Sequence, residues 1–480
     1  MKIKLPKEIE NILNKLERKG FEAYVVGGCV RDILLGKKPK DWDVTTIAKP
    51  EQIQKIFPDS FYKNNFGTVT VKTKSKNKIL KEIEITTFRT EQKYTDKRHP
   101  DKISFTDNLK EDLSRRDFTI NAMAIDKNEK VIDFFNGEKD LKKNILRAVG
   151  EAKERFSEDA LRILRAIRLA NELNFKIEKE TLTAIKKNAH SLQMIAKERI
   201  RDEFIKMIMS DSPEEAIKLL KESDLLKYII PELEKGIGVS QNRHHIYTIY
   251  QHLILSLKFA AKRKYNLEVR LSALLHDIAK PQAKRGQGKE STFYNHDYLS
   301  AKFSVNILQR LKFPRKIIEK VALLVRNHMF VYNVDEVTEA GVRRLLRRVG
   351  PENINDLINL RVTDRLGSGV PKAIPYKLRH LEYIIEKVSK DPISAKMLKI
   401  NGNDLIKSLK IEPGPRLGLI IEALLSETLQ NPKINTKQKL SKKAGELNKL
   451  SDKKLKEKTK KIKEKKQEVD LEMKGKHWVK

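Results

Sequence analysis

Near the N-terminus, the order of hydrophobic and polar positions predicts three short β-strands. Residues 21–26 (FEAYVV) and the segment that begins at 43–46 (DVTT) are rich in apolar and β-branched side chains, which favour strands. Residues 81–88 (KEIEITTF) alternate apolar and polar side chains. This period of two is typical of a strand that is covered on one face. Glu82 and Glu84 fall on its polar face, together with Thr86.

Beyond about residue 150 the pattern changes to helical spacing. Residues 158–168 (EDALRILRAIR) space their apolar side chains as a helix does. From 151 to 235 the helical pattern is broken at Ser212-Pro213 and at Pro231, because proline cannot continue a helix. We therefore predict an α+β fold, with a small mixed sheet and helices in an N-terminal head, followed by all-α domains.

Glycines and aspartates follow the first predicted strand. Gly27 and Gly28 lie at its end, and glycine lets the backbone come within hydrogen-bond reach of a phosphate. Asp41 and Asp43 are one residue apart in an extended segment, so their carboxylates point to the same side. Mg²⁺ is usually held by one or two carboxylates together with the substrate's phosphates. The stretch predicts a Mg²⁺ and triphosphate site, although such an aspartate pair alone also occurs in acidic surface turns.

Charged side chains recur at every third position of the predicted helix 158–168. They are Asp159, Arg162, Arg165 and Arg168. A helix turns about 100° per residue, so these side chains fan round one side. A carboxylate can accept from an exocyclic amine while a guanidinium donates to the adjacent ring nitrogen, which suits cytosine and adenine but not uracil or guanine. Ion pairing between residues three apart explains the first two charges equally well.

The composition agrees with an anionic partner. Lysine and arginine number 100 against 65 aspartates and glutamates, a formal charge of +35, which is typical of proteins that bind nucleic acid or polyphosphate. The single cysteine, Cys29, cannot form an intrachain disulfide, as expected in a reducing cytosol. No signal pattern or apolar run of membrane length is present. We therefore predict a cytoplasmic protein that does not enter a membrane.

From about Leu5 to Met209 the chain resembles the bacterial tRNA nucleotidyltransferases, the CCA-adding enzymes. With the bacterial poly(A) polymerases they form class II of the DNA polymerase β-like nucleotidyltransferases. The matching motifs, in family order, are GGCVRD (27–32), DWDVTT (41–46), EITTFR (84–89), YTDKRHP (94–100), RRDFTINAMA (115–124), EDALRILRAIR (158–168) and ERI (198–200). The resemblance implies a polymerase β-like head that adds C, C and A to the 3′ end of tRNA from CTP and ATP with Mg²⁺.

The resemblance also implies roles for particular residues. Asp41 and Asp43 would hold Mg²⁺, with Glu84 as the third catalytic carboxylate and Glu82 as a weaker candidate. The residues that would contact the nucleotide are Gly28, Arg31, Arg116, Asp117, Asn121, Asp159, Arg162, Arg165 and Arg168, of which Asp159 and Arg162 would serve as an amino-acid template for the base. Two alternatives stay open: Arg31 as a surface partner of Asp32 or Asp41, and Arg116-Asp117 as a helix-capping pair.

Residues 94–100 (YTDKRHP) match a loop that CCA-adding members carry and CC-only members lack. Its presence favours an enzyme that adds the terminal A. A charged surface loop without a role is the alternative.

A second constellation of histidines and aspartates lies further along the chain. Its members are His252, His276, Asp277, His296, His328 and Asp364. The order H, HD, H, H, D resembles the HD superfamily of metal-dependent phosphohydrolases. Imidazole and carboxylate ligands suit Ni²⁺, Mn²⁺, Fe²⁺ or Mg²⁺, and the absence of thiolates argues against structural zinc. Buried histidines that only pack and hydrogen-bond are the alternative.

We predict five domains. They are the nucleotidyltransferase head (1–150), a helical neck with the base template (151–235), a helical HD domain (236–390), a helical tRNA-binding tail (391–432) and a lysine-rich C-terminal extension (433–480). The extension is expected to be a solvated helix or a disordered arm. An A-adding enzyme and a poly(A) polymerase are the nearest alternatives to a CCA-adding enzyme. An HD phosphohydrolase with a vestigial head is the alternative from another class. The oligomeric state is not predicted.

Overall fold

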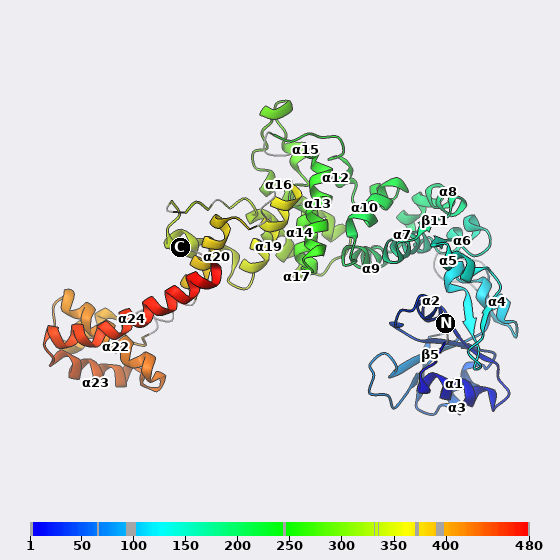
Figure 1. Cartoon of the computed structure of the whole chain (residues 1–480), viewed down its shortest axis with the longest axis horizontal. Coiled ribbons are helices and arrows are strands. Elements are labelled where there is room, and N and C mark those ends of the chain that lie inside the picture. Colours follow the sequence, from blue (N-terminus) through cyan, green and yellow to red (C-terminus); the bar gives the residue numbers. More distant parts are fainter. Residues whose placement is uncertain are drawn as a thin grey trace. The chain divides into compact units, whose positions relative to one another are not determined.

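The computed structural model describes residues 3–64, 67–92, 102–242, 246–330, 332–334, 336–369, 374–389 and 398–478 (Figure 1). The chain forms two compact units. Unit 1 comprises Met1–His328 and Asn359–Val370, and unit 2 comprises Met329–Ile358 and Pro371–Lys480. The predicted head and neck thus lie in unit 1, whereas the predicted HD domain (236–390) is divided between the two units. The four predicted domain boundaries remain predictions. The predicted YTDKRHP loop lies outside the described residues.

A mixed sheet of seven strands forms the centre of the head, as predicted. Its order is β3-β4-β5-β2-β1-β8-β9, with β2 and β5 parallel and the other neighbours antiparallel. The strands are β1 (Ala23–Val26), β2 (Asp43–Thr46), β3 (Ser60–Asn64), β4 (Thr68–Lys72), β5 (Glu82–Thr87), β8 (Met123–Ile125) and β9 (Val131–Asp133). Two short pairs stand apart: β6 (Arg89–Gln92) with β7 (Lys102–Phe105), and β10 (Ile145–Leu146) with β11 (Lys176–Ile177).

The three strands predicted from the sequence are adjacent in this sheet. Asp43 on β2 lies in register with Glu84 on β5, and in-register residues on neighbouring strands project from the same face. On β5, Ile83 and Ile85 are buried while Glu82 is exposed and Glu84 is half-buried, so the predicted alternation is confirmed.

Hydrophobic side chains cover both faces of the sheet. The face that carries Val44 and Ile85 packs against α1 (Lys7–Glu17), α2 (Gly28–Leu34) and α3 (Pro50–Ile56). On the other face, Leu113 of α4 (Leu109–Ser114) and Phe88 pack together with Val26. Because side chains alternate along a strand, Asp43 and Glu84 project from this second face.

The neck is helical, but residues 158–168 are not one helix. α6 (Ala152–Glu158) ends before Asp159, which is extended (φ −127°, ψ 102°), and α7 (Leu161–Leu173) begins two residues later. The Asp159 Oδ1 accepts a hydrogen bond of 3.0 Å from the Leu161 N–H. Aspartate is favoured just before a helix, because its carboxylate can accept a hydrogen bond from one of the N–H groups left free at the helix start. The predicted helix is therefore confirmed only from Leu161 onward, and Asp159 lies outside it.

Two of the remaining neck helices begin at the prolines where the sequence predicted breaks. The remaining neck helices are α8 (Lys179–Asn188), α9 (Lys197–Ile208), α10 (Pro213–Glu222), α11 (Leu226–Ile229) and α12 (Pro231–Glu234), and α5 (Gly137–Lys142) precedes them in the head. α10 and α12 each have proline as their first residue.

The HD segment of unit 1 is a helical bundle. It contains α13 (Ile249–Lys262), α14 (Leu267–Leu275), α15 (Lys280–Ala283), α16 (His296–Arg310), α17 (Arg315–Asn327) and, from residue 359 onward, α19 (Ile354–Gly367). Buried aliphatic side chains of these helices, among them Leu257, Leu274 and Val325, join the hydrophobic core that also includes the neck.

Unit 2 is helical and has its own hydrophobic core. Its helices are α18 (Glu339–Val349), α20 (Tyr376–Ser389), α21 (Gly402–Leu409), α22 (Pro415–Gln430), α23 (Lys437–Asn448) and α24 (Asp452–His477). The core joins Leu405 and Leu424 to Leu440 and Leu455, so it crosses the predicted boundary after residue 432. The lysine-rich extension therefore has an apolar side that the sequence did not reveal.

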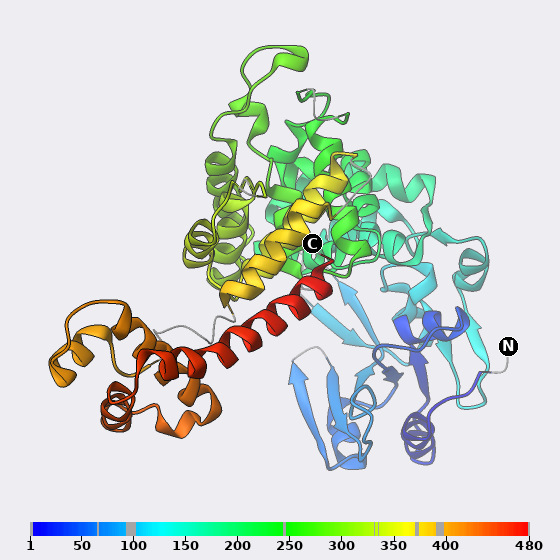
Figure 2. The ribbon, with the colours of Figure 1, turned by 60° about the vertical axis from the view of Figure 1, so that its left-hand side comes forward.

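The long helix α24 is held at both ends within unit 2. Leu455, in its first turn, is fully buried. Near its other end, Tyr383 of α20 donates a hydrogen bond to Asp470, and His477 pairs with Glu386 at 2.7 Å. Figure 2 shows α24 running from the α22–α23 pair toward α20. Within the described residues, no helix combines the length and apolarity needed to cross a membrane.

Candidate functional site

A cavity of about 960 Å³ lies where the head meets the neck within unit 1. Its wall is dominated by charged side chains, with more arginines and lysines than aspartates and glutamates. All of the predicted catalytic and nucleotide-binding residues except Glu84 line it: Gly28, Arg31, Asp41, Asp43, Arg116, Asp117, Asn121, Asp159, Arg162, Arg165 and Arg168. A cavity of this size and charge suits a nucleoside triphosphate.

The two aspartates of the DWD motif lie on one side of the chain. Asp41 and Asp43 both line the cavity, whereas Trp42 between them is 7% exposed and belongs to the hydrophobic core. Glu84 is in register with Asp43, and Glu82 lies opposite Lys72, further along the strand. This register favours Glu84 over Glu82 as the third carboxylate, although the described residues do not bring the three carboxylates together within 4.8 Å.

The absence of a side chain at Gly27 lets Arg116 and Asp43 approach the backbone closely. The φ of Gly27 is +86°, and a Cβ at this position would lie 3.1 Å from Nη1 of Arg116 and 3.5 Å from Oδ2 of Asp43. Arg116 also pairs with Asp112 at 3.6 Å, yet its buried Nε has no hydrogen-bond partner in the described structure. A buried donor without a partner beside a carboxylate is suited to a phosphate oxygen.

A chain of hydrogen bonds connects the glycine turn to the neck. Arg31 pairs with Asp32 at 2.7 Å and donates to the Asn121 Oδ1 at 2.7 Å. Asn121 donates to Asp117, and Arg165 of α7 donates to the other oxygen of Asp117 at 2.5 Å and 2.8 Å. Arg31 therefore has the predicted alternative partner and also lines the cavity. Asp117 is already an acceptor for protein donors, and its predicted contact with a ribose hydroxyl remains a prediction.

This network perturbs the acidity of Asp117. Burial disfavours the charged form, but the positive charge of Arg165 and the hydrogen bonds from Asn121 and Arg165 outweigh it and lower the pKa of Asp117 to about 2. A carboxyl group whose folded-state pKa lies below its unfolded value stabilises the fold above the unfolded pKa.

Replacing Asp117 with asparagine should therefore destabilise the head in a pH-dependent manner. We expect a loss of about 2 kcal/mol of unfolding free energy at neutral pH. The difference from the wild type should disappear as the pH falls from about 4 toward 2, where the native carboxyl group becomes protonated. Thermal unfolding followed between pH 7 and pH 2 measures this. Asp59→Asn, at an exposed head position, is the control, and a pH-independent gap would contradict the prediction.

The predicted template residues have separate partners. Asp159 pairs with Arg199 of α9 at 3.1 Å, while Arg162 pairs with Glu158 at 2.5 Å and donates to the backbone oxygen of Arg115. The alternative interpretation, an ion pair between Asp159 and Arg162, is therefore wrong, because each residue pairs with a different partner. Asp159 lies in the extended link between α6 and α7, whereas Arg162 lies on α7. Both side chains line the cavity. Arg168 also lines it and pairs with Glu203.

Several cavity residues had not been assigned a role from the sequence. Arg199 donates two hydrogen bonds to the carboxylate of Asp159. The sequence signal for Arg199 was its position within the ERI motif (198–200). Lys37, Lys38 and Lys40 line the cavity from the connector before Asp41, but a basic connector is too common to predict a site.

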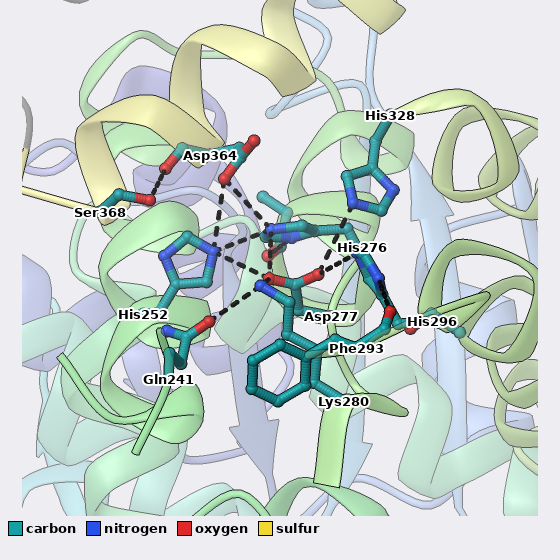
Figure 3. A network of polar contacts seen from close by, with 12 residues as sticks. Gln241, His252, His276, Asp277, Lys280, Phe293, His296, His328, Asp364 and Ser368 are labelled. Atoms are coloured by element: carbon teal, nitrogen blue, oxygen red, sulfur yellow. Dashed lines mark hydrogen bonds and ion pairs between the residues drawn. The ribbon is translucent and has the colours of Figure 1, made fainter. Parts of the chain in front are cut away.

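The second constellation also assembles. Figure 3 shows His252, His276, His296 and His328 around Asp277, with Asp364 of α19 above them. The described residues contain two groups whose ligand atoms lie within 4.8 Å of one another, His252-His276-Asp277 and Asp277-His296-His328. Asp364 completes the first group, because its Oδ1 lies 3.5 Å and 3.6 Å from the Nε2 atoms of His252 and His276. All six predicted residues thus converge, and Asp277 is shared.

Backbone hydrogen bonds orient three of these imidazoles. Nδ1 of His276, His296 and His328 lies 3.0, 2.6 and 2.6 Å from the carbonyl oxygen three residues earlier. An Nδ1–H donated to a carbonyl leaves the lone pair on Nε2, the usual arrangement of a metal-ligating histidine. These Nε2 atoms face Asp277. Burial lowers the pKa of His276 and of His296, which favours the neutral, ligating form.

Lys280 is a member of the cluster that the sequence did not predict. Its ammonium lies 2.6 Å from Asp277 Oδ2 and 2.8 Å from the Gln241 Oε1. Burial disfavours the charged form of Asp277, but Lys280 and the surrounding histidines hold the pKa of this carboxyl well below its usual range. Asp277 is therefore an anion at neutral pH. Buried atoms without hydrogen-bond partners in the described structure, His296 Nε2 and Asp277 Oδ1, fit a site that takes a divalent cation.

Family models match three parts of the chain. A model described as "Poly A polymerase head domain" matches residues 23–147, and one described as "Probable RNA and SrmB- binding site of polymerase A" matches 174–237. A "tRNA nucleotidyltransferase domain 2" model matches 297–444. The mixed-sheet head, the carboxylate pair and the arginine-lined cavity, together with these matches, define a tRNA nucleotidyltransferase.

Similarity over nearly the whole chain identifies the family. A CCA-adding enzyme of Ligilactobacillus salivarius is 35% identical over 440 residues, 91% of this chain and 95% of its own length. The chain belongs to the family of bacterial CCA-adding enzymes.

Solved structures agree with the family and the fold. The crystal structure of the Bacillus stearothermophilus CCA-adding enzyme in complex with CTP matches with a TM-score of 0.61 and 28% identity, over 92% of this chain and 97% of that chain. A tRNA nucleotidyltransferase complexed with a primer tRNA and an incoming ATP analogue matches with a TM-score of 0.55 and 25% identity, over 80% of this chain and 100% of that chain.

Proposed function

We propose that this protein adds C, C and A to the 3′ end of tRNA from CTP and ATP, with Mg²⁺ as the cofactor of the head. The observation that carries the proposal is one cavity that is lined both by Asp41 and Asp43 of the head and by the arginines and proposed template residues of the neck. The relatives named above, which include enzymes bound to CTP, to a primer tRNA and to an ATP analogue, support the substrates.

The donor set of the cavity fits Mg²⁺ and a triphosphate. Asp41 and Asp43 offer hard oxygen ligands on the same wall, and Glu84 lies beside Asp43. Bound Mg²⁺ supplies charge stabilisation for the attacking 3′ hydroxyl and the departing pyrophosphate. Arg116, with its unpartnered Nε, would bind phosphate oxygens near Gly27. Arg31 and Asn121 would position the nucleotide through the hydrogen bonds that connect them to Asp117.

Base selection would come from Asp159 and Arg162. In this proposal Asp159 accepts from the exocyclic amine of cytosine or adenine and Arg162 donates to the neighbouring ring nitrogen. Arg199 holds Asp159 at 3.1 Å and Glu158 holds Arg162 at 2.5 Å, so each group is oriented by a separate partner before a base arrives. Such preorganisation lowers the cost of ordering a template when a nucleotide binds.

Incubation with defined tRNA transcripts tests the function. Transcripts that end before CCA, after the first C or after CC are each offered one nucleoside triphosphate with Mg²⁺. A CCA-adding enzyme should extend the first two with CTP and the third with ATP. Extension only of the transcript ending in CC would indicate an A-adding enzyme. Long adenylate tails on unrelated RNA would indicate a poly(A) polymerase.

The template hypothesis predicts a change of selectivity in Asp159→Ala. Removing the acceptor for the amino group should lower the preference for CTP over UTP by roughly tenfold to a hundredfold, because uracil lacks the amine but shares the shape of cytosine. The ratio of kcat/KM for CTP and UTP on a transcript ending before CCA measures this. Asp202→Ala on α9, outside the cavity lining, is the control. Unchanged rejection of UTP by Asp159→Ala would remove Asp159 from the template.

A second function is favoured by the HD cluster. We propose that His252, His276, Asp277, His296, His328 and Asp364 bind divalent transition metal and hydrolyse phosphate esters. The two overlapping ligand groups that share Asp277 support this proposal. In such a hydrolysis the oxygen of water forms a new bond to phosphorus, one phosphorus–oxygen ester bond breaks, and the departing oxygen receives the proton. A bound divalent ion supplies acidification of that water.

A further inference from the structure

A surface cavity of about 500 Å³ lies beside the HD cluster. Its lining includes Gln282, Arg285, Tyr294, Asn295, Tyr298 and Arg326. Tyr294 and Tyr298 each lie two residues from the cluster member His296, and Arg326 lies two residues before His328. The segments that supply the cluster's second ligand group therefore also supply this cavity.

Tyr294 and Tyr298 are unusual in their exposure. They are 72% and 56% exposed, more than any other tyrosine of the described residues. The guanidinium of Arg326 lies 5.5 Å from the ring centre of Tyr298 and forms an ion pair with Asp297. An exposed aromatic ring with an arginine over it is a surface on which an unpaired nucleobase stacks.

The rest of the lining suits the polar parts of a nucleotide. Arg285 is exposed, and its side chain has no partner among the described residues, while its backbone is fixed by hydrogen bonds of 3.0 Å and 2.9 Å with Thr292. The guanidinium of Arg285 is therefore available to pair with a phosphate through two N–H groups. The amides of Gln282 and Asn295 offer both donors and acceptors for the edge of a base.

We propose that this cavity binds an unpaired nucleotide that carries a terminal phosphate, either free or at the end of an RNA strand. The base stacks on Tyr298 and Tyr294, and the phosphate pairs with Arg285. The cavity thereby defines the substrates of the HD cluster as nucleotides that carry a terminal phosphate, and this step rests on the proposed HD function. Binding of the nucleotide in the cavity does not depend on that function.

Photocrosslinking tests the binding in full-length protein freed of metal by a chelator, so that hydrolysis is not required. The probes are 5-iodouridine 3′-monophosphate and a tetranucleotide that ends in 5-iodouridine 3′-phosphate. Mass spectrometry should locate adducts at Tyr294 or Tyr298 with at least one probe. Adducts with both probes would show that a free nucleotide suffices, and adducts with the tetranucleotide alone would assign the site to RNA ends. Adducts only at other residues would overturn the proposal.

Variants separate stacking from general damage to the fold. Tyr298→Ala should reduce the adduct yield at Tyr294 about tenfold or more, whereas Tyr298→Phe should retain it because the ring remains. Arg285→Gln should weaken binding of the phosphorylated probes but not of 5-iodouridine itself. Tyr62→Ala, at an exposed position on β3 of the head, should have no effect. Equal losses in Tyr298→Ala and Tyr62→Ala would contradict the site, whatever the outcome of hydrolysis assays.

Discussion

Replacing Asp43 with asparagine is expected to lower nucleotide addition by on the order of a thousandfold or more, while tRNA affinity stays nearly unchanged. Asparagine keeps the size of the side chain but removes the charge that faces the cavity beside Gly27 and Arg116. The loss should appear in kcat rather than in the Kd for tRNA, because the proposed role of the carboxylate is to hold Mg²⁺ at the reacting phosphate and not to bind the body of the RNA. Single-turnover addition of CTP, with tRNA binding measured separately, checks this.

The neighbouring strand offers a matched pair of variants for the same mechanism. Glu84 is in register with Asp43, and Glu82 is two residues away on the same polar face. Glu84→Gln should therefore impair addition strongly, and Glu82→Gln should leave it close to that of the wild type. The reverse result would transfer the role to Glu82. Near-normal turnover in Asp43→Asn would exclude the proposed chemistry of the head altogether.

The head could be predicted from the sequence because its signals are local. The alternation in residues 81–88 fixes which side chains of β5 are buried, and the spacing of Asp41 and Asp43 fixes their common side. What the sequence could not supply is the pairing of strands distant in the chain. That β5 lies parallel to β2, and thereby places Glu84 beside Asp43, depends on contacts across some forty residues.

The neck shows where a local pattern is overridden. The apolar spacing of residues 158–168 continues through Asp159, yet the helix breaks there because the carboxylate satisfies the Leu161 N–H and pairs with Arg199. A periodicity argument weighs only burial, whereas this break depends on one local hydrogen bond, from the Leu161 N–H, and on the contact with Arg199 of a helix that begins some forty residues later. Lys280 illustrates the same limit, because its contact with Asp277 is local but its contact with Gln241 is not.

Mutation of the HD cluster is expected to abolish metal binding and hydrolysis at that site. The variant His276→Ala with Asp277→Ala removes a shared ligand and its neighbour, so purified protein should lose bound transition metal and any Mn²⁺- or Ni²⁺-dependent hydrolysis of 2′,3′-cyclic phosphates. CCA addition should continue, because the head uses carboxylates of a different segment. Elemental analysis and a phosphate-release assay measure the first two, and transcript extension measures the third.

Stability must be separated from ligation in this test, since both residues are almost fully buried. Asp277→Asn keeps the shape of the side chain but removes the negative charge that Lys280 and four imidazoles face. It should therefore lose metal without the cavity that alanine creates. His190→Ala, an exposed histidine of the neck, is the control. If wild-type protein carries no metal and hydrolyses no phosphate ester with any divalent ion, the cluster is a packed remnant, and Lys280 would then stabilise Asp277 as a buried ion pair.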